Sequence, residues 1–319
     1  MRRSDYDITD KVRTTDAIEV CDEVVRIFRR LFPAGNPKPM KRAFGDLSQL
    51  YHGKHPDYHP CDTEYHDIQH VLDVTLAMAR LLDGFRRDPM TPGPLTPELF
   101  NVGIVTALFH DFGYLRRRND RKHRYGAEYT LTHVSRGAKF LRDYLPGIGL
   151  KKHAGDAAVI IHFTGYERDP ATIRINDPVM RRVGEILGSA DIIAQMSDRC
   201  YLEKCHDRLY PEFVLGGIAR RQQPDGKTVI VYKSGRDLLS KTPAFYTNAM
   251  KRLDDKLHQA YRYAETHFGG SNLYLAEMDK NEAHAIEATS VAGRSRLRRA
   301  PPSTLLKGVR AYPETLVIH

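Results

Sequence analysis

The sequence predicts an all-α fold, a bundle of helices with one small β-hairpin. Apolar residues recur at helical spacing in several segments, as at Ile68, Val71 and Leu72. No alternation of strands with helices and no glycine-rich phosphate loop is found between these segments. One stretch, 224–234 (PDGKTVIVYKS), combines β-branched residues with an Asp225-Gly226 turn, which predicts the hairpin.

The predicted elements follow one another along the chain in three regions. Residues 16–32 form the first helix, which ends before Pro33, and a Gly/Pro/His-rich loop follows over 33–63. Thr96 begins a helix that has Pro97 at its first position and leads into His110. The other helices are expected over 64–84, 126–144, 153–163, 178–210 and 243–266. We therefore expect an N-terminal helix and loop (1–63), a main helical domain (64–285) and a basic, flexible tail (286–319).

Composition narrows the class of protein. The 319 residues are 41% apolar, enough for a sizeable core, and the formal net charge of +9 suits an anionic partner. We expect a small phosphoester as this partner rather than nucleic acid. The four cysteines form no CxxC pair, which is typical of a reduced compartment. No apolar run approaches the roughly 20 residues needed to span a bilayer, and the N-terminus has no apolar signal core, so a cytoplasmic, non-membrane protein is expected.

The pair His110-Asp111 carries the clearest chemical signal. It follows the apolar stretch 102–109, and a carboxylate buried behind such a stretch needs a compensating cation. An aspartate can also bridge two metal ions with its two oxygens, which a histidine cannot do. A lone histidine on an apolar helix is more often a hydrogen-bonded core residue. Here the whole set favours metal binding: His70, His110, Asp111, His133, His162 and Asp191.

Two metals held by these nitrogen and carboxylate ligands suggest hydrolysis of a phosphate ester. The ligand types are compatible with Fe, Mn, Zn or Mg. A basic cluster directly after His110-Asp111 could bind the phosphate oxygens of the substrate. The alternative is a solvated loop paired with Asp120 and Glu128. The predicted substrate-binding residues are Arg116, Arg117, Arg118, Arg121 and Lys122.

The order of His70, His110-Asp111 and Asp191 resembles the HD-domain metal-dependent phosphohydrolase superfamily. The segment 65–74 (YHDIQHVLDV) also resembles the YHNxxHAxDV signature of class I cyclic nucleotide phosphodiesterases. This resemblance implies an HD-domain helical bundle in which His66 is the general acid and His70 binds metal. The chain departs from that signature at Asp67 and Val71, and it lacks the HDxxHPGxxN continuation.

The middle of the chain resembles the HD-GYP branch of the same superfamily. The segments 133–141 (HVSRGAKFL), 162–170 (HFTGYERDP) and 190–201 (ADIIAQMSDRCY) are similar to its HPxxGAxIL, histidine-plus-GYP and ADxxDAxxSDRxY segments. The resemblance implies that His133 and His162 serve a second metal. Tyr114 replaces the lysine that usually follows that family's HDxG.

The expected function is a metal-dependent phosphodiesterase that hydrolyses a cyclic nucleotide, with cyclic dinucleotides left open. Asp111 and Asp191 would help to hold a hydroxide that bridges the two metals, and His66 would protonate the leaving oxygen. Two alternatives come from other classes. One is a mixed-valent di-iron HD-domain oxygenase, and the other is a non-catalytic nucleotide-binding HD module.

Overall fold

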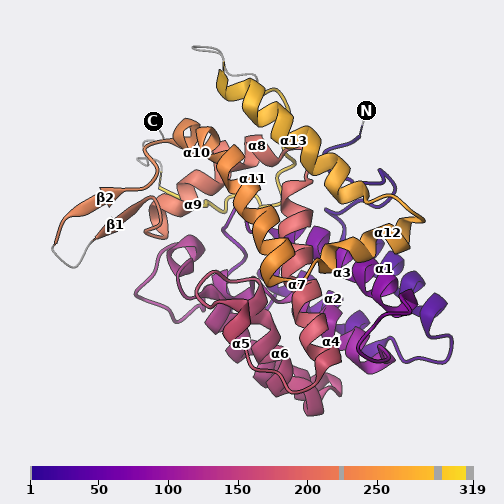
Figure 1. Cartoon of the computed structure of the whole chain (residues 1–319). Coiled ribbons are helices and arrows are strands. Elements are labelled where there is room, and N and C mark those ends of the chain that lie inside the picture. Colours follow the sequence, from indigo (N-terminus) through magenta and orange to yellow (C-terminus); the bar gives the residue numbers. More distant parts are fainter. Residues whose placement is uncertain (1, 223–225, 291–296, 314–319) are drawn as a thin grey trace.

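The computed structural model describes residues 2–222, 226–290 and 297–313, and it confirms a mostly helical chain with one small antiparallel hairpin (Figure 1). Strands β1 (Arg220–Gln222) and β2 (Thr228–Ile230) form the hairpin, which projects from the helical body. The predicted turn residue Asp225 lies outside the described residues. The helices are α1 (Ala17–Leu31), α2 (Lys38–Tyr51), α3 (Ile68–Arg87), α4 (Pro97–Leu108), α5 (His133–Tyr144), α6 (Ala154–Ile160), α7 (Pro178–Met196), α8 (Tyr201–Lys204), α9 (Tyr210–Leu215), α10 (Gly235–Ser240), α11 (Thr242–Lys251), α12 (Tyr263–Phe268) and α13 (Leu273–Ser290).

Helix α3 is the centre of the fold. Asp67 caps its N-terminus by accepting the backbone N–H of His70 at 2.9 Å, and nearly all of its side chains are buried. It packs against α1, α4, α7 and α12 (Figure 1). Helix α7 begins after a similar cap, since Asp177 accepts the N–H groups of Val179 and Met180. The packing of α3 against α4 and α7 brings together the segments that carry the candidate ligands His70, His110 and Asp191.

Three predicted elements differ from the structure. The loop expected over 33–63 contains α2, whose apolar residues recur at Met40, Phe44 and Leu47 and are buried. The pattern is hidden by prolines at its start, where a helix tolerates them. The long helix expected over 243–266 is broken, because His258 and Gln259 adopt left-handed backbone conformations between α11 and α12. Helix α5 begins at His133 rather than near residue 126, after a short 3-10 turn (Gly126–Tyr129).

The chain forms one hydrophobic core to which the N-terminal region also belongs. Buried residues of α1 and α2, including Phe28 and Leu47, join the same cluster as Leu72 of α3. Within the segment expected to be a flexible tail, α13 continues to Ser290, and residues 297–313 form hydrogen bonds with the helical body, as from Arg208 to the Pro302 carbonyl at 2.9 Å. None of the described helices is long and apolar enough to cross a membrane.

A buried ion pair ties the N-terminal segment to α3. Asp7 Oδ2 lies 2.5 Å from the Arg80 guanidinium, and Asp7 Oδ1 accepts the backbone N–H of Val12 at 2.9 Å. Burial raises the pKa of Asp7, but Arg80 and the Val12 N–H outweigh it and lower the pKa to about 2. Because this folded-state pKa lies below the unfolded value, the pair stabilises the fold above about pH 4, and its contribution is lost as the pH falls through 2.

We therefore expect Asp7→Asn to lower the free energy of unfolding at pH 7 by about 2–3 kcal/mol. The difference from wild type should shrink steadily between pH 4 and pH 2. Urea denaturation across this range measures both effects, with Asp22→Asn, at an exposed position of α1, as the control. An equal loss at pH 7 and pH 2 would show that Asp7 acts by packing rather than by charge.

Candidate metal centre

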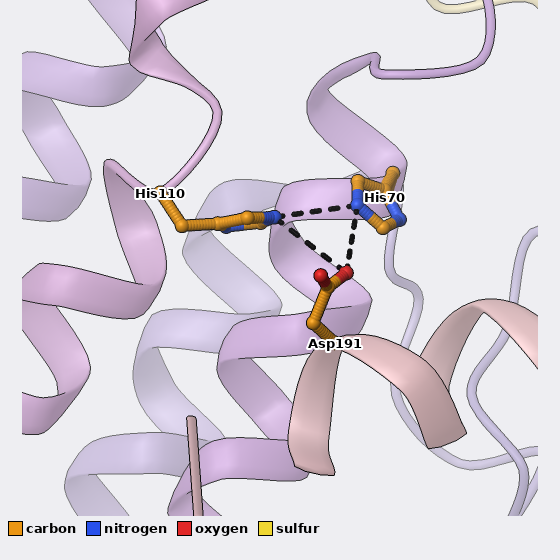
Figure 2. Close-up of side chains that lie close together, drawn as sticks. All are labelled: His70, His110 and Asp191. Carbon is orange, nitrogen blue, oxygen red and sulfur yellow. Dashed lines mark hydrogen bonds and ion pairs between the residues drawn. The ribbon is translucent and has the colours of Figure 1, made fainter. Parts of the chain in front are cut away.

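Three helical segments bring a compact set of metal-ligand atoms together. His70 lies in the first turn of α3, His110 follows the end of α4, and Asp191 lies on α7. Their ligand atoms all lie within 4.8 Å of one another, and the side chains point toward a common centre (Figure 2). The two Nε2 atoms of His70 and His110 are 3.3 Å apart, and Asp191 Oδ1 lies 3.5 Å from His70 Nε2.

Asp111 adds a carboxylate whose two oxygens face different partners. Its Oδ2 atom lies 3.3 Å from His70 Nε2 and 3.2 Å from His110 Nε2. Its Oδ1 atom lies 3.7 Å from His133 Nε2, at the start of α5. Asp111 is only 3% exposed, and no hydrogen-bond donor within the described residues satisfies its buried Oδ2. A buried oxygen of this kind fits a cation as its partner.

Backbone carbonyls fix the orientation of two of these imidazoles. His110 Nδ1 donates to the Ala107 carbonyl at 2.7 Å, and His133 Nδ1 donates to the Thr130 carbonyl at 2.6 Å. Each ring therefore keeps the lone pair of Nε2 for another partner. A hydrogen bond from the second ring nitrogen is the usual way in which proteins orient metal-binding histidines.

The electrostatics of the cluster favour a positive charge between the carboxylates. Burial lowers the pKa of His70, but the carboxylates of Asp111 and Asp191 beside its imidazole outweigh it and raise the pKa to about 10. The pKa of His110 is also raised, because Asp111 outweighs the effect of burial. Burial raises the pKa of Asp111, yet the neighbouring imidazoles hold it well below its usual range. The same carboxylates would stabilise a bound metal ion.

His162 is paired with a carboxylate of the loop that follows it. It is buried, and its Nδ1 lies 2.6 Å from Glu167 Oε1. The three-residue ligand cluster found in the described part of the chain does not include it. The structure thus brings His70, His110, Asp111 and Asp191 together, with His133 next to Asp111, and leaves His162 paired with a carboxylate.

His66 lies beside the cluster and is held by a buried carboxylate. Its Nδ1 lies 2.5 Å from Glu212 Oε2, and Glu212 Oε1 also accepts the backbone N–H of Tyr65 at 2.7 Å. The His66 ring stacks on Tyr114 at 4.4 Å between centroids, and Tyr114 stacks on His133 at 4.5 Å. Tyr114 therefore acts as an aromatic spacer between two histidines.

A cavity of about 540 Å³ adjoins these residues. His66, His70, Asp111, His133 and Asp191 all line it. The rest of its wall is rich in aromatic and aliphatic side chains from the segment 201–245, together with two cations. These further lining residues include Tyr201, Phe213, Ile218, Arg221, Tyr232, Leu238, Lys241 and Phe245. A pocket of this size and character is typical of sites for nucleotide-sized ligands.

The basic loop predicted to bind substrate is not among the residues that line this cavity. Arg116 pairs with Asp62 at 3.0 Å, Arg117 lies over the Tyr58 ring, and Arg118 donates to the Gly53 carbonyl. These contacts fasten the loop to the segment 53–62. The other two predicted residues, Arg121 and Lys122, are exposed at the surface. The cations of the cavity are instead Arg221 and Lys241.

Two residues of the site carry no local motif in the sequence. Glu212 lies 146 positions from His66 in the chain, and only the fold joins them. Gln195 accepts the Tyr65 hydroxyl at 3.0 Å and donates to Asp191 Oδ1 at 3.3 Å, so it orients a ligand carboxylate. Its position one turn after Asp191 on α7 is the only sequence signal that could have indicated this contact.

Gly113 allows the His110-Asp111 turn to approach α5. A Cβ atom at this position would overlap the backbone carbonyl of His133, and a change of rotamer cannot relieve such a clash. We expect Gly113→Ala to displace α5, to cost about 1–3 kcal/mol of stability and to weaken metal binding. Denaturation and a Mn²⁺ titration measure the two effects, and Gly147→Ala, which meets no atom within 4 Å, is the control. Wild-type metal affinity in Gly113→Ala would contradict this account.

A scan against protein-family models and a search of curated proteins found no match for this chain.

Proposed function

We propose that this chain is a metal-dependent phosphohydrolase that cleaves a nucleotide-sized phosphodiester, with a cyclic nucleotide as the substrate class favoured by the YHxxxHxxDV motif. The arrangement of Asp111 carries the proposal. Its two oxygens face different histidines, and one of them is buried without a hydrogen-bond donor among the described residues. Such a carboxylate suits a site for two adjacent cations.

The residues present fit divalent metal ions. His70, His110 and Asp191 would hold one ion, His133 would contribute to a second, and Asp111 would be shared. When bound, such ions supply Lewis acidity toward phosphoryl oxygens and make water a better nucleophile at neutral pH. The absence of cysteine from the set leaves Fe, Mn, Zn and Mg as candidates.

His66 is the residue best placed to deliver a proton. It lines the cavity beside the ligand cluster, and its Nδ1 is committed to Glu212. Its Nε2 is therefore the nitrogen that would carry a proton to the leaving oxygen of the phosphodiester. Glu212 fixes the tautomer and the ring orientation of His66. This is the arrangement that general acid catalysis requires.

The rest of the cavity supports a substrate with an aromatic body and negative charge. Phe213 and Tyr232 stack at 5.6 Å between centroids and both line the wall. An aromatic wall of this kind is suited to contact with a nucleobase. Arg221 supplies positive charge at the same wall, together with Lys241, whose ammonium pairs with Asp237 at 2.9 Å. This charge would attract a phosphate-bearing ligand.

A substrate screen tests this function. The metal content of the purified protein is measured by mass spectrometry, and the protein is then assayed with Mn²⁺ or Mg²⁺ against cyclic mononucleotides and cyclic dinucleotides. We expect cleavage of at least one of them. Two irons per chain with O₂-dependent turnover and no phosphoester cleavage would indicate the oxygenase instead. Nucleotide binding with neither metal nor turnover would indicate the non-catalytic module.

A further inference from the structure

The last described segment of the chain, residues 297–313, lies against the turn that precedes α3, and we call it the C-terminal strap. It contains no helix or strand. The Arg208 guanidinium holds its first half by donating to the carbonyls of Pro301 at 3.1 Å and Pro302 at 2.9 Å. The buried Glu203 carboxylate accepts the backbone N–H of Arg299 at 3.1 Å. Two charged residues of the helical body are thus used to dock the strap.

The strap bonds the outer two residues of the turn 64–67. The Thr304 hydroxyl donates to Asp67 Oδ2 at 2.6 Å. The Tyr312 hydroxyl donates to Glu64 Oε2 at 3.1 Å. The strap therefore contacts both the first and the last residue of this turn.

The inner two residues of the same turn belong to the candidate site. Tyr65 and His66 both line the cavity. The Tyr65 hydroxyl donates to Gln195, which in turn contacts Asp191, while His66 pairs with Glu212. The first and last residues of this turn thus bond to the strap, whereas its two middle residues line the cavity. A displacement of its outer residues would move His66.

Asp67 is the mechanical link between the strap and the metal ligands. Its carboxylate is buried, with the residue 1% exposed, and Oδ1 accepts the His70 N–H at 2.9 Å as the cap of α3. The Oδ2 atom has the Thr304 hydroxyl at 2.6 Å and the Arg208 guanidinium only at 3.8 Å. Without the hydroxyl, a buried carboxylate oxygen would be left without a close donor, which is costly. The cap that carries His70 would then shift or open.

We propose that the C-terminal strap sets the position of His66 and His70, with Thr304 as a positioning residue that acts through Asp67. The catalytic consequence rests on the proposed function, whereas the positioning itself does not. Docking of the strap places His66 and His70 for metal binding and catalysis. A change that breaks the Thr304–Asp67 hydrogen bond therefore lowers both metal affinity and turnover. The hydrogen bond between Thr304 and Asp67 joins residues that are more than 230 positions apart in the sequence.

Hydrogen exchange of the His70 backbone amide tests the positioning directly, because this amide donates to Asp67. In Thr304→Val we expect this amide to exchange about tenfold faster, since its acceptor loses support. Thr304→Ser, which keeps the hydroxyl, should restore the wild-type rate. Ser303→Ala changes the exposed neighbouring residue and should have no effect. Amides in the middle of α4 serve as internal references for global unfolding.

The same variants are then compared in a Mn²⁺ titration and in turnover of a cyclic nucleotide. We expect Thr304→Val to lower Mn²⁺ affinity and kcat by about tenfold each with KM nearly unchanged, because a small misplacement of catalytic groups has effects of this size or larger. An unchanged His70 exchange rate or unchanged Mn²⁺ affinity in Thr304→Val would overturn the proposal, as would faster exchange throughout α4. If wild type cleaves no phosphodiester, the proposed function fails, and the exchange and Mn²⁺ results still decide the role of the strap.

Discussion

Replacement of Asp111 with asparagine is expected to abolish metal binding and phosphodiester cleavage together. The side chain keeps its size, so the effect reports the loss of charge. Asp111 lies against His70 and His110 through Oδ2 and faces His133 through Oδ1. Partners that only orient metal ligands are already worth about 10–100-fold in affinity, so loss of a direct and shared ligand should exceed about 100-fold. A Mn²⁺ titration and a cyclic nucleotide assay measure both losses.

Asp143→Asn is the matched control, since Asp143 is an exposed carboxylate on α5, the helix that begins with His133. We expect it to bind metal and turn over as wild type does. If Asp111→Asn binds two equivalents of Mn²⁺ at the affinity of wild type, then the buried carboxylate is structural. The assignment of the metal centre would then be wrong.

Replacement of His66 with alanine is expected to lower kcat by about 10²–10⁴-fold while metal stoichiometry stays unchanged. The reason is that His66 lines the cavity but lies outside the His70–His110–Asp191 cluster. Glu212→Gln should reproduce part of the defect, because it removes the charge that holds His66 Nδ1. Steady-state kinetics and metal content of the two variants measure these effects.

The nature of the leaving group separates a general acid from a merely structural histidine. Bis(p-nitrophenyl) phosphate releases an anion that needs no proton, so the defect of His66→Ala should shrink to less than about tenfold on this substrate. His123→Ala is the control, since His123 also pairs with a carboxylate, Asp120, but does not line the cavity. An equal defect of His66→Ala on both substrates would count against proton donation.

The fold could be predicted where local signals were strong. The helix that follows Thr96 has a capping residue and a proline at its first position, and α4 begins as predicted. Helix α2 was missed because Pro37 and Pro39 suggest a loop, although prolines are compatible with a helix start. The break near His258 was not predictable, because a left-handed conformation of ordinary residues depends on tertiary packing.

The candidate site also divides into residues that local motifs indicate and residues that only the fold brings in. The histidines and aspartates of the cluster lie in motifs on separate segments, so their convergence follows once α3, α4 and α7 pack together. Glu212 and the strap residue Thr304 carry no motif, and each reaches the site only through contacts distant in sequence. Arg116 follows His110 closely in sequence, but its guanidinium pairs with Asp62, and none of the five predicted loop residues lines the cavity.

The most direct test of the account is to titrate Mn²⁺ into metal-free protein while cyclic nucleotide hydrolysis is followed. We expect no hydrolysis at the start and a rise in rate that saturates as the His70–His110–Asp111–Asp191 centre fills, with no rise in Asp111→Asn. Hydrolysis at the full rate in metal-free protein, or saturation with metal and no cleavage of any phosphodiester, would contradict it.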